Sequence, residues 1–445
     1  MLHPPLAYLG RSLLGLCLAV TGAHTRAADA PEPRAFADLE GVFRAEFNQD
    51  GTRVIICTRK PEIGLWDTAT GQPIAGDLKA GTVVTTHLLS PDARAVLTGF
   101  PDGRSRVFDT LSGNALSPLL DAAFQEGESQ RAAFSPDGKY VVILETEFAS
   151  VFQVSTGTRE AKIPSRLAPG GNEPDMNATA AFTADGSRCL FLVGDSVTAY
   201  DTSTWKPQGK PLKHPSAESA YYLGFAASPD GRWLVTFDNP GENGPKGGLQ
   251  VWDATKGKSL GKPIVAVNGI EGRFLAGGNR LLITPGRGEA SVRELPSLKT
   301  LTTIKKHDEI EGPKVAASPD GKWLLSWGSD RELHLIDPAT GKVVDRFSSG
   351  AAISQVLLLP DSTGALVVFD NSTFITQDYY DHYIMRFTFP ELRPTHSFRT
   401  TKYLLNATLA PDGRSLALIV GKTDHEQLWL YDAANLQPKS PVKEQ

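Results

Sequence analysis

Two short patterns alternate along almost the whole chain, and they restrict its fold more than any other feature. The first is Ser-Pro-Asp-Gly followed by a β-branched or aromatic run, as at residues 135–142, 228–235 and 318–325. The second is an aromatic or aliphatic residue, then Asp and a small polar turn, as in residues 66–71 (Trp-Asp-Thr-Ala-Thr-Gly). Proline presets the first turn angle, aspartate caps free amides and glycine accepts positive φ. Each pattern therefore predicts a tight turn between strands.

The second pattern recurs at a nearly constant interval. Nine units can be marked between Asp67 and Asp432, although three of them carry Gln153, Glu294 or Thr388 at the Asp position. The mean interval of about 46 residues is close to that of a four-stranded propeller blade. In unit seven, for example, four strands are expected at 314–318, 323–328, 333–337 and 343–347. The sequence thus predicts an all-β fold, a single β-propeller of nine four-stranded blades, or eight if the weakly marked unit six is not a blade.

At this spacing the two patterns resemble WD40 repeats of the bacterial type, over about residues 41–440. The resemblance implies a closed ring that acts as an interaction platform. The Gly-His dipeptide that opens many units of this family is absent, but His214 and His307 lie in the matching connections. A hydrogen-bonded tetrad of His, Ser or Thr, Asp and Trp is typical of the family. The resemblance implies that it survives in part in unit seven, as His307, Ser326 and Asp330, with Ile336 in the Trp place.

Residues 1–27 have the layout of a secretory signal peptide, with no acid, an early Arg11 and an apolar run at 13–20. That run is too short to span a bilayer. We therefore expect a signal peptide at 1–27, a leader at 28–40 and the propeller at 41–445, with no membrane span after the signal is removed. The mature protein would be periplasmic or extracellular. Cys57 and Cys189 lie in apolar runs, so we expect packed core thiols rather than a disulfide.

Composition and motifs argue against several functions. The net charge is -5 and no basic block occurs, which argues against nucleic-acid binding. Neither His-Glu-x-x-His nor Cys-x-x-Cys is present, so the sequence predicts no metal site and no cofactor. A Gly-x-Ser-x-Gly match at 257–261 falls in a turn that lacks the strand-turn-helix setting of a nucleophile.

Length variation indicates where a binding surface would lie. The strands a, b, c and d of a blade alternate in direction, so b–c and d–a connections share one end of the ring, here called the loop face. From the first turn Asp to the second, five units span 16 or 17 residues, whereas units nine, five and eight span 20, 23 and 27, which predicts longer b–c loops. The link from Gln153 to Asp185 is also long. Loops carry function more often than the scaffold that holds them.

The sequence therefore favours an exported, non-catalytic scaffold that binds a protein or peptide on the loop face, as a monomer or as a subunit of a larger assembly. Tyrosines supply rigid amphipathic contact area, and three of them cluster at 379–383. The candidate partner-binding residues are Asn172, Asp238, Asn243, Lys246, Tyr379, Tyr380 and His382.

The alternative is a hydrolase or lactonase-like propeller with its site at the central channel. Such a site gathers side chains from distant units and leaves no local motif. The inner strands are mostly small or apolar, but Glu46, His87 and Asn406 are polar exceptions in units one, two and nine, which a closed ring makes neighbours.

Overall fold

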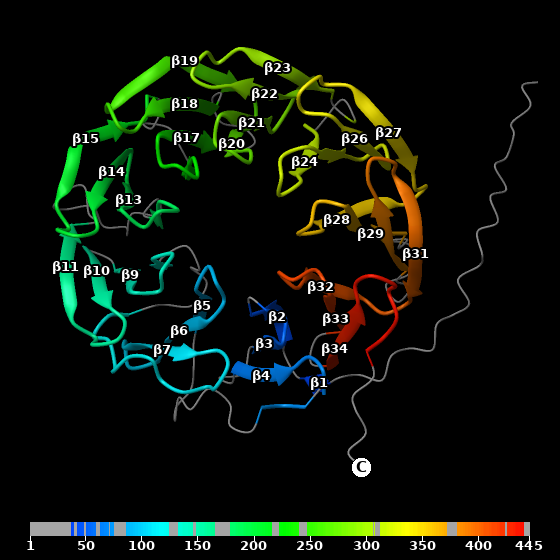
Figure 1. The fold of residues 1–445 in the computed structure, drawn as a ribbon, viewed down its shortest axis with the longest axis horizontal. Helices are drawn as coiled ribbons and strands as arrows, with labels where there is room; N and C mark the ends of the chain where they lie inside the picture. The colour runs from blue at the N-terminus through cyan, green and yellow to red at the C-terminus, as the bar shows by residue number, and fades with distance from the viewer. Residues whose placement is uncertain are drawn as a thin grey trace, which may run out of the picture.

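The computed structural model describes residues 37–39, 42–48, 50–58, 63–70, 72–74, 86–123, 132–145, 148–164, 179–215, 222–239, 247–305, 307, 312–371, 381–422 and 425–439. These residues form nine antiparallel sheets arranged as a closed ring, with the first strand of each repeat unit nearest the centre (Figure 1). No described residue is helical, and none forms a segment with the length and hydropathy of a membrane-spanning helix. The predicted all-β propeller of nine blades is confirmed.

Each unit of the sequence becomes one blade. Blades one to three contain β2 (Val42–Phe47), β3 (Arg53–Thr58) and β4 (Ile63–Asp67); β5 (Thr86–Leu89), β6 (Ala95–Gly99) and β7 (Ser105–Asp109); and β8 (Ala132–Phe134), β9 (Tyr140–Leu144), β10 (Phe148–Gln153) and β11 (Arg159–Pro164). Blades four to six contain β12 (Thr179–Phe182), β13 (Arg188–Val193), β14 (Ser196–Asp201) and β15 (Pro207–Lys213); β16 (Tyr222–Ala227), β17 (Trp233–Asn239), β18 (Gly247–Asp253) and β19 (Lys258–Ala266); and β20 (Ile270–Phe274), β21 (Arg280–Pro285), β22 (Ala290–Glu294) and β23 (Thr300–Ile304).

The remaining blades follow the same order. They contain β24 (Lys314–Ala317), β25 (Leu324–Trp327), β26 (Glu332–Ile336) and β27 (Val343–Ser348); β28 (Ala352–Leu358), β29 (Gly364–Asp370), β30 (His382–Thr388) and β31 (Arg393–Thr400); and β32 (Leu404–Leu409), β33 (Ser415–Lys422) and β34 (His425–Asp432). Unit six is a complete four-stranded blade despite its weak sequence marks. The four strands predicted for unit seven match those of its blade to within one residue at nearly every end.

The N-terminal segment closes the ring. Strand β1 (Ala37–Leu39) pairs antiparallel with β34, with Ala37 opposite Leu428 and Leu39 opposite Glu426. The ninth sheet therefore has the order β1-β34-β33-β32 and combines both ends of the chain. These three residues belong to the segment 28–40, which was expected to be a leader, so part of that leader is the outer strand of a blade.

The tight turns explain why the first pattern is so regular. In blade seven the Ser318 hydroxyl donates to Asp320 (2.7 Å) and accepts from the Trp323 amide (2.9 Å), while Asp320 also accepts from the Lys322 amide (3.0 Å). Gly321 completes the turn with φ +68°. Burial of Asp320 opposes ionisation, but the bonds from Ser318 and Lys322 outweigh it and lower the pKa of the carboxyl from 3.8 to about 2.

The core lies mainly between neighbouring blades. Each packed cluster draws side chains from two consecutive sheets, as where Val235 and Val251 of blade five meet Leu281 and Ile283 of blade six. Cys189 is a free, fully buried thiol in such a cluster, as predicted, and burial raises its pKa. The side chain of Cys57 lies outside the described residues. Alternate residues of a strand face the two neighbouring blades, so both faces of each sheet are covered by another blade, and only the sheet edges are not.

Unit nine differs from the prediction. Its extra length was expected to form a b–c loop, but β33 and β34 are eight residues long each, and only residues 423 and 424 separate them. The additional residues extend the two strands instead, and they pair as far as Lys422 opposite His425.

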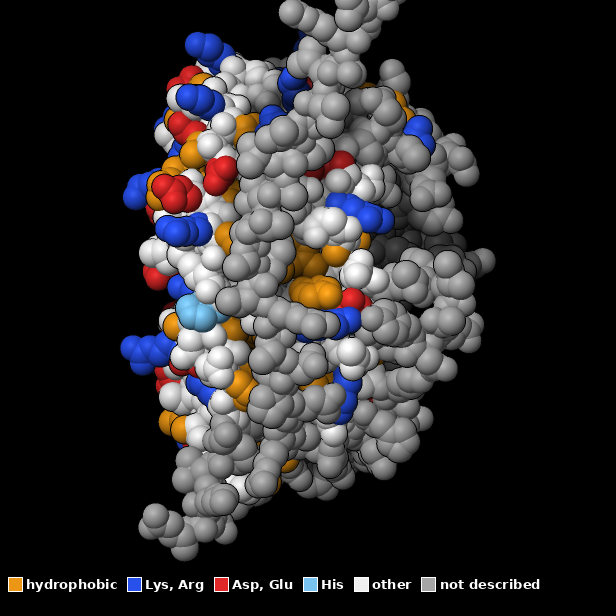
Figure 2. All heavy atoms as spheres, turned by 90° about the vertical axis from the view of Figure 1, so that its right-hand side faces the viewer, with side chains coloured by type: hydrophobic (Ala, Val, Ile, Leu, Met, Phe, Trp, Pro, Cys, Tyr) orange, Lys and Arg blue, Asp and Glu red, His pale blue; other side chains and the backbone are white. Residues whose placement is uncertain are grey.

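The charge distribution fits the small net charge. Figure 2 shows the outer wall of the ring on the side of β27 and β31, where Lys and Arg side chains are interleaved with Asp and Glu. No single sign dominates the described part of this view.

Candidate interaction face

Most of the predicted partner-binding residues lie in the connections of the loop face. Five of them are outside the described residues, and their role stays a prediction: Asn172, Asn243, Lys246, Tyr379 and Tyr380. The other two, Asp238 and His382, are described and buried.

Asp238 lies inside blade five rather than in a polar loop. Strand β17 continues to Asn239, and Asp238 is only 2% exposed. Its carboxylate accepts a hydrogen bond from the Gly248 amide on the neighbouring strand and lies 3.6 Å from Nε2 of His214. The sequence predicted Asp238 as a partner-binding residue of the long b–c loop, because the run of polar residues that begins with it gives no sign of where the strand ends. Asp238 therefore fastens the base of the loop and does not reach its surface.

Blade five contains a complete form of the four-residue network. The Thr236 hydroxyl lies 2.7 Å from Nδ1 of His214 and accepts a hydrogen bond from Nε1 of Trp252 (2.9 Å). A carboxylate only accepts, so in the neutral ring Nε2 of His214 carries the proton and faces Asp238, while Nδ1 accepts from the Thr236 hydroxyl. These four buried side chains tie the d–a link to strands b and c. We expected the tetrad to survive only partly, in unit seven; this complete copy was missed, although Thr236, Asp238 and the Trp252-Asp253 pair are its marks.

Blade seven contains the expected partial network. Both carboxylate oxygens of Asp330 lie 2.9 Å from Nδ1 of His307, and Nε2 of His307 lies 3.0 Å from the Ser326 hydroxyl. Carboxylates only accept, so Nδ1 donates to Asp330 and the Ser326 hydroxyl donates to Nε2. Ile336 is buried in the Trp place, as predicted. Burial lowers the pKa of His307, and the nearby Asp330 carboxylate only partly offsets this effect.

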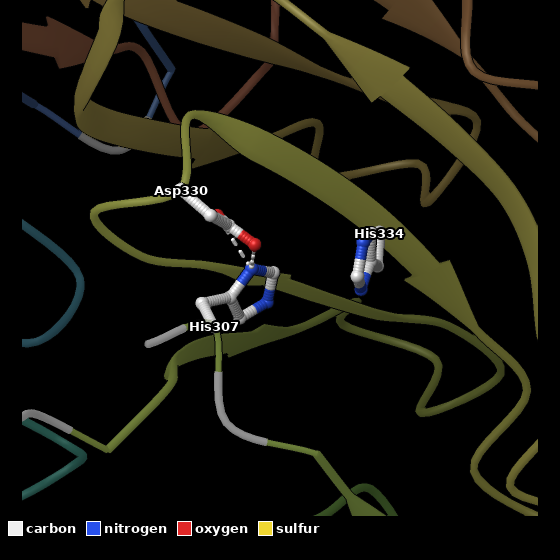
Figure 3. A group of neighbouring side chains, drawn as sticks. All are labelled: His307, Asp330 and His334. Carbon is white, nitrogen blue, oxygen red and sulfur yellow. Dashed lines mark hydrogen bonds and ion pairs between the residues drawn. The ribbon is translucent and has the colours of Figure 1, made fainter. Parts of the chain in front are cut away.

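A second histidine joins this network. His334 on β26 stacks beside His307 with ring centroids 4.5 Å apart and an interplanar angle of 35°. Nε2 of His334 lies 2.9 Å from the Glu332 carboxylate. Figure 3 shows Asp330 and His334 on two sides of the His307 ring. The sequence predicted no metal site, but one potential ligand atom from each of His307, Asp330 and His334 lies within 4.8 Å of the others. The only local sequence signal for this cluster is the placement of Glu332 and His334 at alternate positions of one strand.

Blade eight buries a charged group at the foot of its b–c connection. Asp381 is 2% exposed and pairs with Nε of Arg399 at 2.6 Å, and it accepts hydrogen bonds from Asn371 (3.2 Å) and the Tyr383 hydroxyl (3.2 Å). This ion pair links β31 to the first residue before β30. It fixes the position at which the connection leaves the ring.

His382 follows directly and is 4% exposed, so it cannot offer its ring to a partner as predicted. Its Nε2 accepts a hydrogen bond from the Leu404 amide (3.4 Å), while Nδ1 is buried without a hydrogen-bond partner among the described residues. Burial lowers the pKa of His382, against the opposing effect of the Asp370 and Asp381 carboxylates. The ring is therefore part of the packing between blades eight and nine.

Apolar side chains are exposed on the loop face. Val267 lies in the d–a link before blade six and is 44% exposed; Tyr403 and Leu405, at the start of blade nine, are each 41% exposed. Tyr403 was not among the predicted residues because a single tyrosine in a short link carries no sequence pattern. Together they give the described part of this face the amphipathic character that protein contacts use.

The three candidate channel residues lie on inner strands of adjacent blades (Figure 1). Ala45 and Phe47 pack towards blade nine, so the alternating Glu46 faces blade two. Leu89 packs towards blade one, and His87 shares its side of the strand. Asn406 alternates with Ala407, which packs towards blade eight, so it faces blade one. Glu46 and His87 thus face a common space between blades, and Asn406 faces the next one. The enzymatic alternative stays a prediction.

No protein-family model and no curated protein matches the sequence. Solved structures do match its fold. A eukaryotic initiation factor is similar at TM-score 0.62 and 17% identity, covering 90% of this chain and 95% of that one. The C-terminal WD40 domain of Sif2 is similar at TM-score 0.52 and 12% identity, covering 89% and 97%. The dihydro-haem d1 dehydrogenase NirN matches at TM-score 0.49 and 17% identity, over 84% and 78%. With its nine blades, its repeated turns and its histidine networks, this chain has the WD40-type β-propeller fold.

Proposed function

We propose that this chain is an exported, non-catalytic scaffold that binds a protein or peptide on its loop face. The observation that carries the proposal is the contrast between the two ends of the ring. One end has tight Pro-Asp-Gly and Asp-x-x-Thr-Gly turns, in which Ser, Asp and Thr side chains bond to the backbone or to one another. The other end receives the long insertions of units five and eight and the long link between units three and four.

The described residues of the loop face support a contact surface. The feet of both long b–c connections are rigid, since Asp238 and Asp381 are buried and bonded at the points where the strands end. Rigid feet lower the entropy that a loop loses on binding. Val267, Tyr403 and Leu405 add exposed apolar area close to these feet.

The proposal is tested by cross-linking the mature protein to its partners in the exported fraction and identifying them by mass spectrometry. The variant Tyr379→Ser/Tyr380→Ser removes two tyrosines of the unit-eight connection and leaves the buried His382 unchanged. We expect it to lose the partners that the wild type captures. The matched control is Leu111→Ser, because Leu111 is 55% exposed but lies in the tight turn after β7, at the opposite end of the ring.

Identical capture by the wild type and the tyrosine variant, or loss only in Leu111→Ser, would contradict the proposed face. Export is tested separately by N-terminal sequencing of the secreted or periplasmic product. We expect the sequence to begin at Ala28; a product that keeps residues 1–27 would contradict export through a cleaved signal. Size-exclusion chromatography of the same product distinguishes a monomer from a subunit of an assembly.

A further inference from the structure

Three metal-ligating side chains meet in blade seven at the loop face. His307 comes from the d–a link, Asp330 from the turn between β25 and β26, and His334 from β26 (Figure 3). Their ligand atoms lie within 4.8 Å of one another. Gly328 allows the link to approach, because a Cβ at that position would lie only 2.3 Å from Cβ of His307. The backbone thus brings the three side chains together from one link, one turn and one strand.

Blade five provides an internal comparison. Thr236 pairs with Gln250 across β17 and β18, and Ser326 pairs with His334 in the same way across β25 and β26. In blade five the indole of Trp252 bonds to Thr236, and Gln250 bonds to backbone carbonyl oxygens such as that of Val251 (2.8 Å). In blade seven the indole is replaced by Ile336, and the residue at the Gln250 position is a histidine. The difference between the two blades is therefore a second imidazole in place of a closed hydrogen-bond network.

The hydrogen bonds around the two rings suit metal ligation. Nε2 of His334 donates to the Glu332 carboxylate, which leaves its other nitrogen with a lone pair in the neutral ring. If His307 binds a metal through Nδ1, its proton moves to Nε2 and is donated to the Ser326 hydroxyl, which lies 3.0 Å away. Metal-bound histidines commonly donate their second nitrogen to an oxygen in this manner. Asp330 and Glu332 supply two negative charges that match a divalent cation.

We propose that His307, Asp330 and His334 bind one divalent transition metal ion, of which Zn²⁺ is the type best suited to two imidazoles and a carboxylate. Zinc bonds to nitrogen and oxygen are about 2.0–2.2 Å long, so tetrahedral ligand atoms lie about 3.3 Å apart. One potential ligand atom of each side chain already lies within 4.8 Å of the others, and rotations of the partly exposed Asp330 and His334 side chains would bring the ligand atoms to bonding distance. Water would complete the coordination sphere.

The test uses the full mature chain, without a histidine tag and stripped of metal by a chelator. Co²⁺ is added as a spectroscopic probe, and Zn²⁺ is then used to displace it. We expect one equivalent of Co²⁺ per chain, visible d–d absorption in the intensity range of a four-coordinate site, and complete displacement by Zn²⁺. His334→Gln restores the blade-five residue at this position and should weaken Co²⁺ binding at least tenfold. Asp330→Asn should do the same.

The matched control is His396→Gln, which removes an exposed histidine of β31 and should bind Co²⁺ as the wild type does. Zn²⁺ should also raise the melting temperature of the wild type and of His396→Gln, but not of His334→Gln. Circular dichroism verifies that each variant is folded; if His334→Gln does not fold, Asp330→Asn decides. Absence of stoichiometric uptake by the wild type, or wild-type uptake by a folded His334→Gln or Asp330→Asn variant, would overturn the proposal and leave a purely structural network.

Discussion

At the scale of single residues, blades five and seven use the same positions in two ways. In blade five, Trp252 donates to Thr236 and completes the network; in blade seven, Ile336 takes the place of Trp252, and His334, at the Gln250 position, adds a second ring. Both networks hold a d–a link against strands b and c. The histidines therefore contribute to the stability of the loop face, whether or not they have a further role.

The contribution of the Trp252 indole hydrogen bond to the free energy of unfolding can be measured by comparison with another buried tryptophan. Trp252→Phe removes the donor to Thr236, whereas Trp327 is equally buried but its Nε1 has no hydrogen-bond partner among the described residues. Both substitutions remove a similar volume. We expect Trp252→Phe to lower the free energy of unfolding by about 1–2 kcal/mol more than Trp327→Phe, because only the first loses a buried bond. Urea unfolding provides the measurement, and equal losses would mean that the tetrad bond adds no stability.

Burial of His382 makes stability depend on pH. The pKa of His382 is lowered in the folded state, so below about 6.5 the unfolded chain binds more protons than the folded one. Stability is then full above that pH and falls as the pH drops towards the folded pKa. His382→Gln should have a smaller loss of urea midpoint between pH 7.5 and 5.5 than the wild type. The pKa of His307 is also lowered in the folded state, so the urea midpoint of His382→Gln should still fall somewhat as the pH drops. His396→Gln is the surface control. If His382→Gln lost as much urea midpoint between pH 7.5 and 5.5 as the wild type, His382 would not be a source of the pH dependence.

At the scale of elements, the repeated turns could be predicted closely because their defining side chains bond within the turn. Ser318 and Asp320 bond to each other and to the amides of Trp323 and Lys322, and Gly321 takes the positive φ that the turn needs. The ends of the long b–c connections could not be predicted in this way. Asp238 and Asp381 are held by His214, Gly248 and Arg399, which are distant in sequence or on another strand, so their burial is not encoded in the local pattern.

The closing strand β1 is too short and too weakly patterned to be recognised in the sequence. Its contribution can be tested by comparing a chain that begins at Ala28 with one that begins at Gly41. Removal of β1 exposes the edge of β34 and deletes a few backbone hydrogen bonds, worth about 1–4 kcal/mol together. We expect a lower urea midpoint and, because an open edge can pair with another chain, self-association in light scattering. Equal stability and a monomeric state for both chains would show that β1 is dispensable.

At the scale of the whole molecule, the ring is held by contacts between blades as well as by its closing sheet. Arg280 donates to the Gly321 carbonyl oxygen (3.2 Å) and Ser362 accepts from the Asp320 amide (3.1 Å), so successive turns are tied together. This regularity is why the number and order of blades followed from the sequence. The separation of Asn406 from Glu46 and His87 did not, because it depends on which neighbouring blade each alternate residue of a strand faces.

Circular permutation can separate the contribution of the closing sheet to stability from that of the contacts between blades. Ala37 pairs with Leu428, and the Lys439 amide donates to the Leu430 carbonyl oxygen, so the first and last described residues lie on the same edge of β34, where a short linker can join them. Opening the chain after Lys256, in the turn between β18 and β19, moves the shared sheet to blade five. Opening it after Gly350, between blades seven and eight, leaves no shared sheet. We expect both to fold, but the second to unfold faster in urea, since its ring opens without separating paired strands. Equal unfolding rates would contradict a role for the shared sheet.

The pairing of β1 with β34 also has a consequence for synthesis. Among the described strands, β1 leaves the ribosome first, but it finds its partner only after β34 has been made. Until then, one edge of the last blade and the first strand itself carry unpaired backbone groups, which chaperones and proteases can recognise. A chain that is cut short near its C-terminus never hides them. Only a chain that extends through β34 can cover the backbone edge of β1.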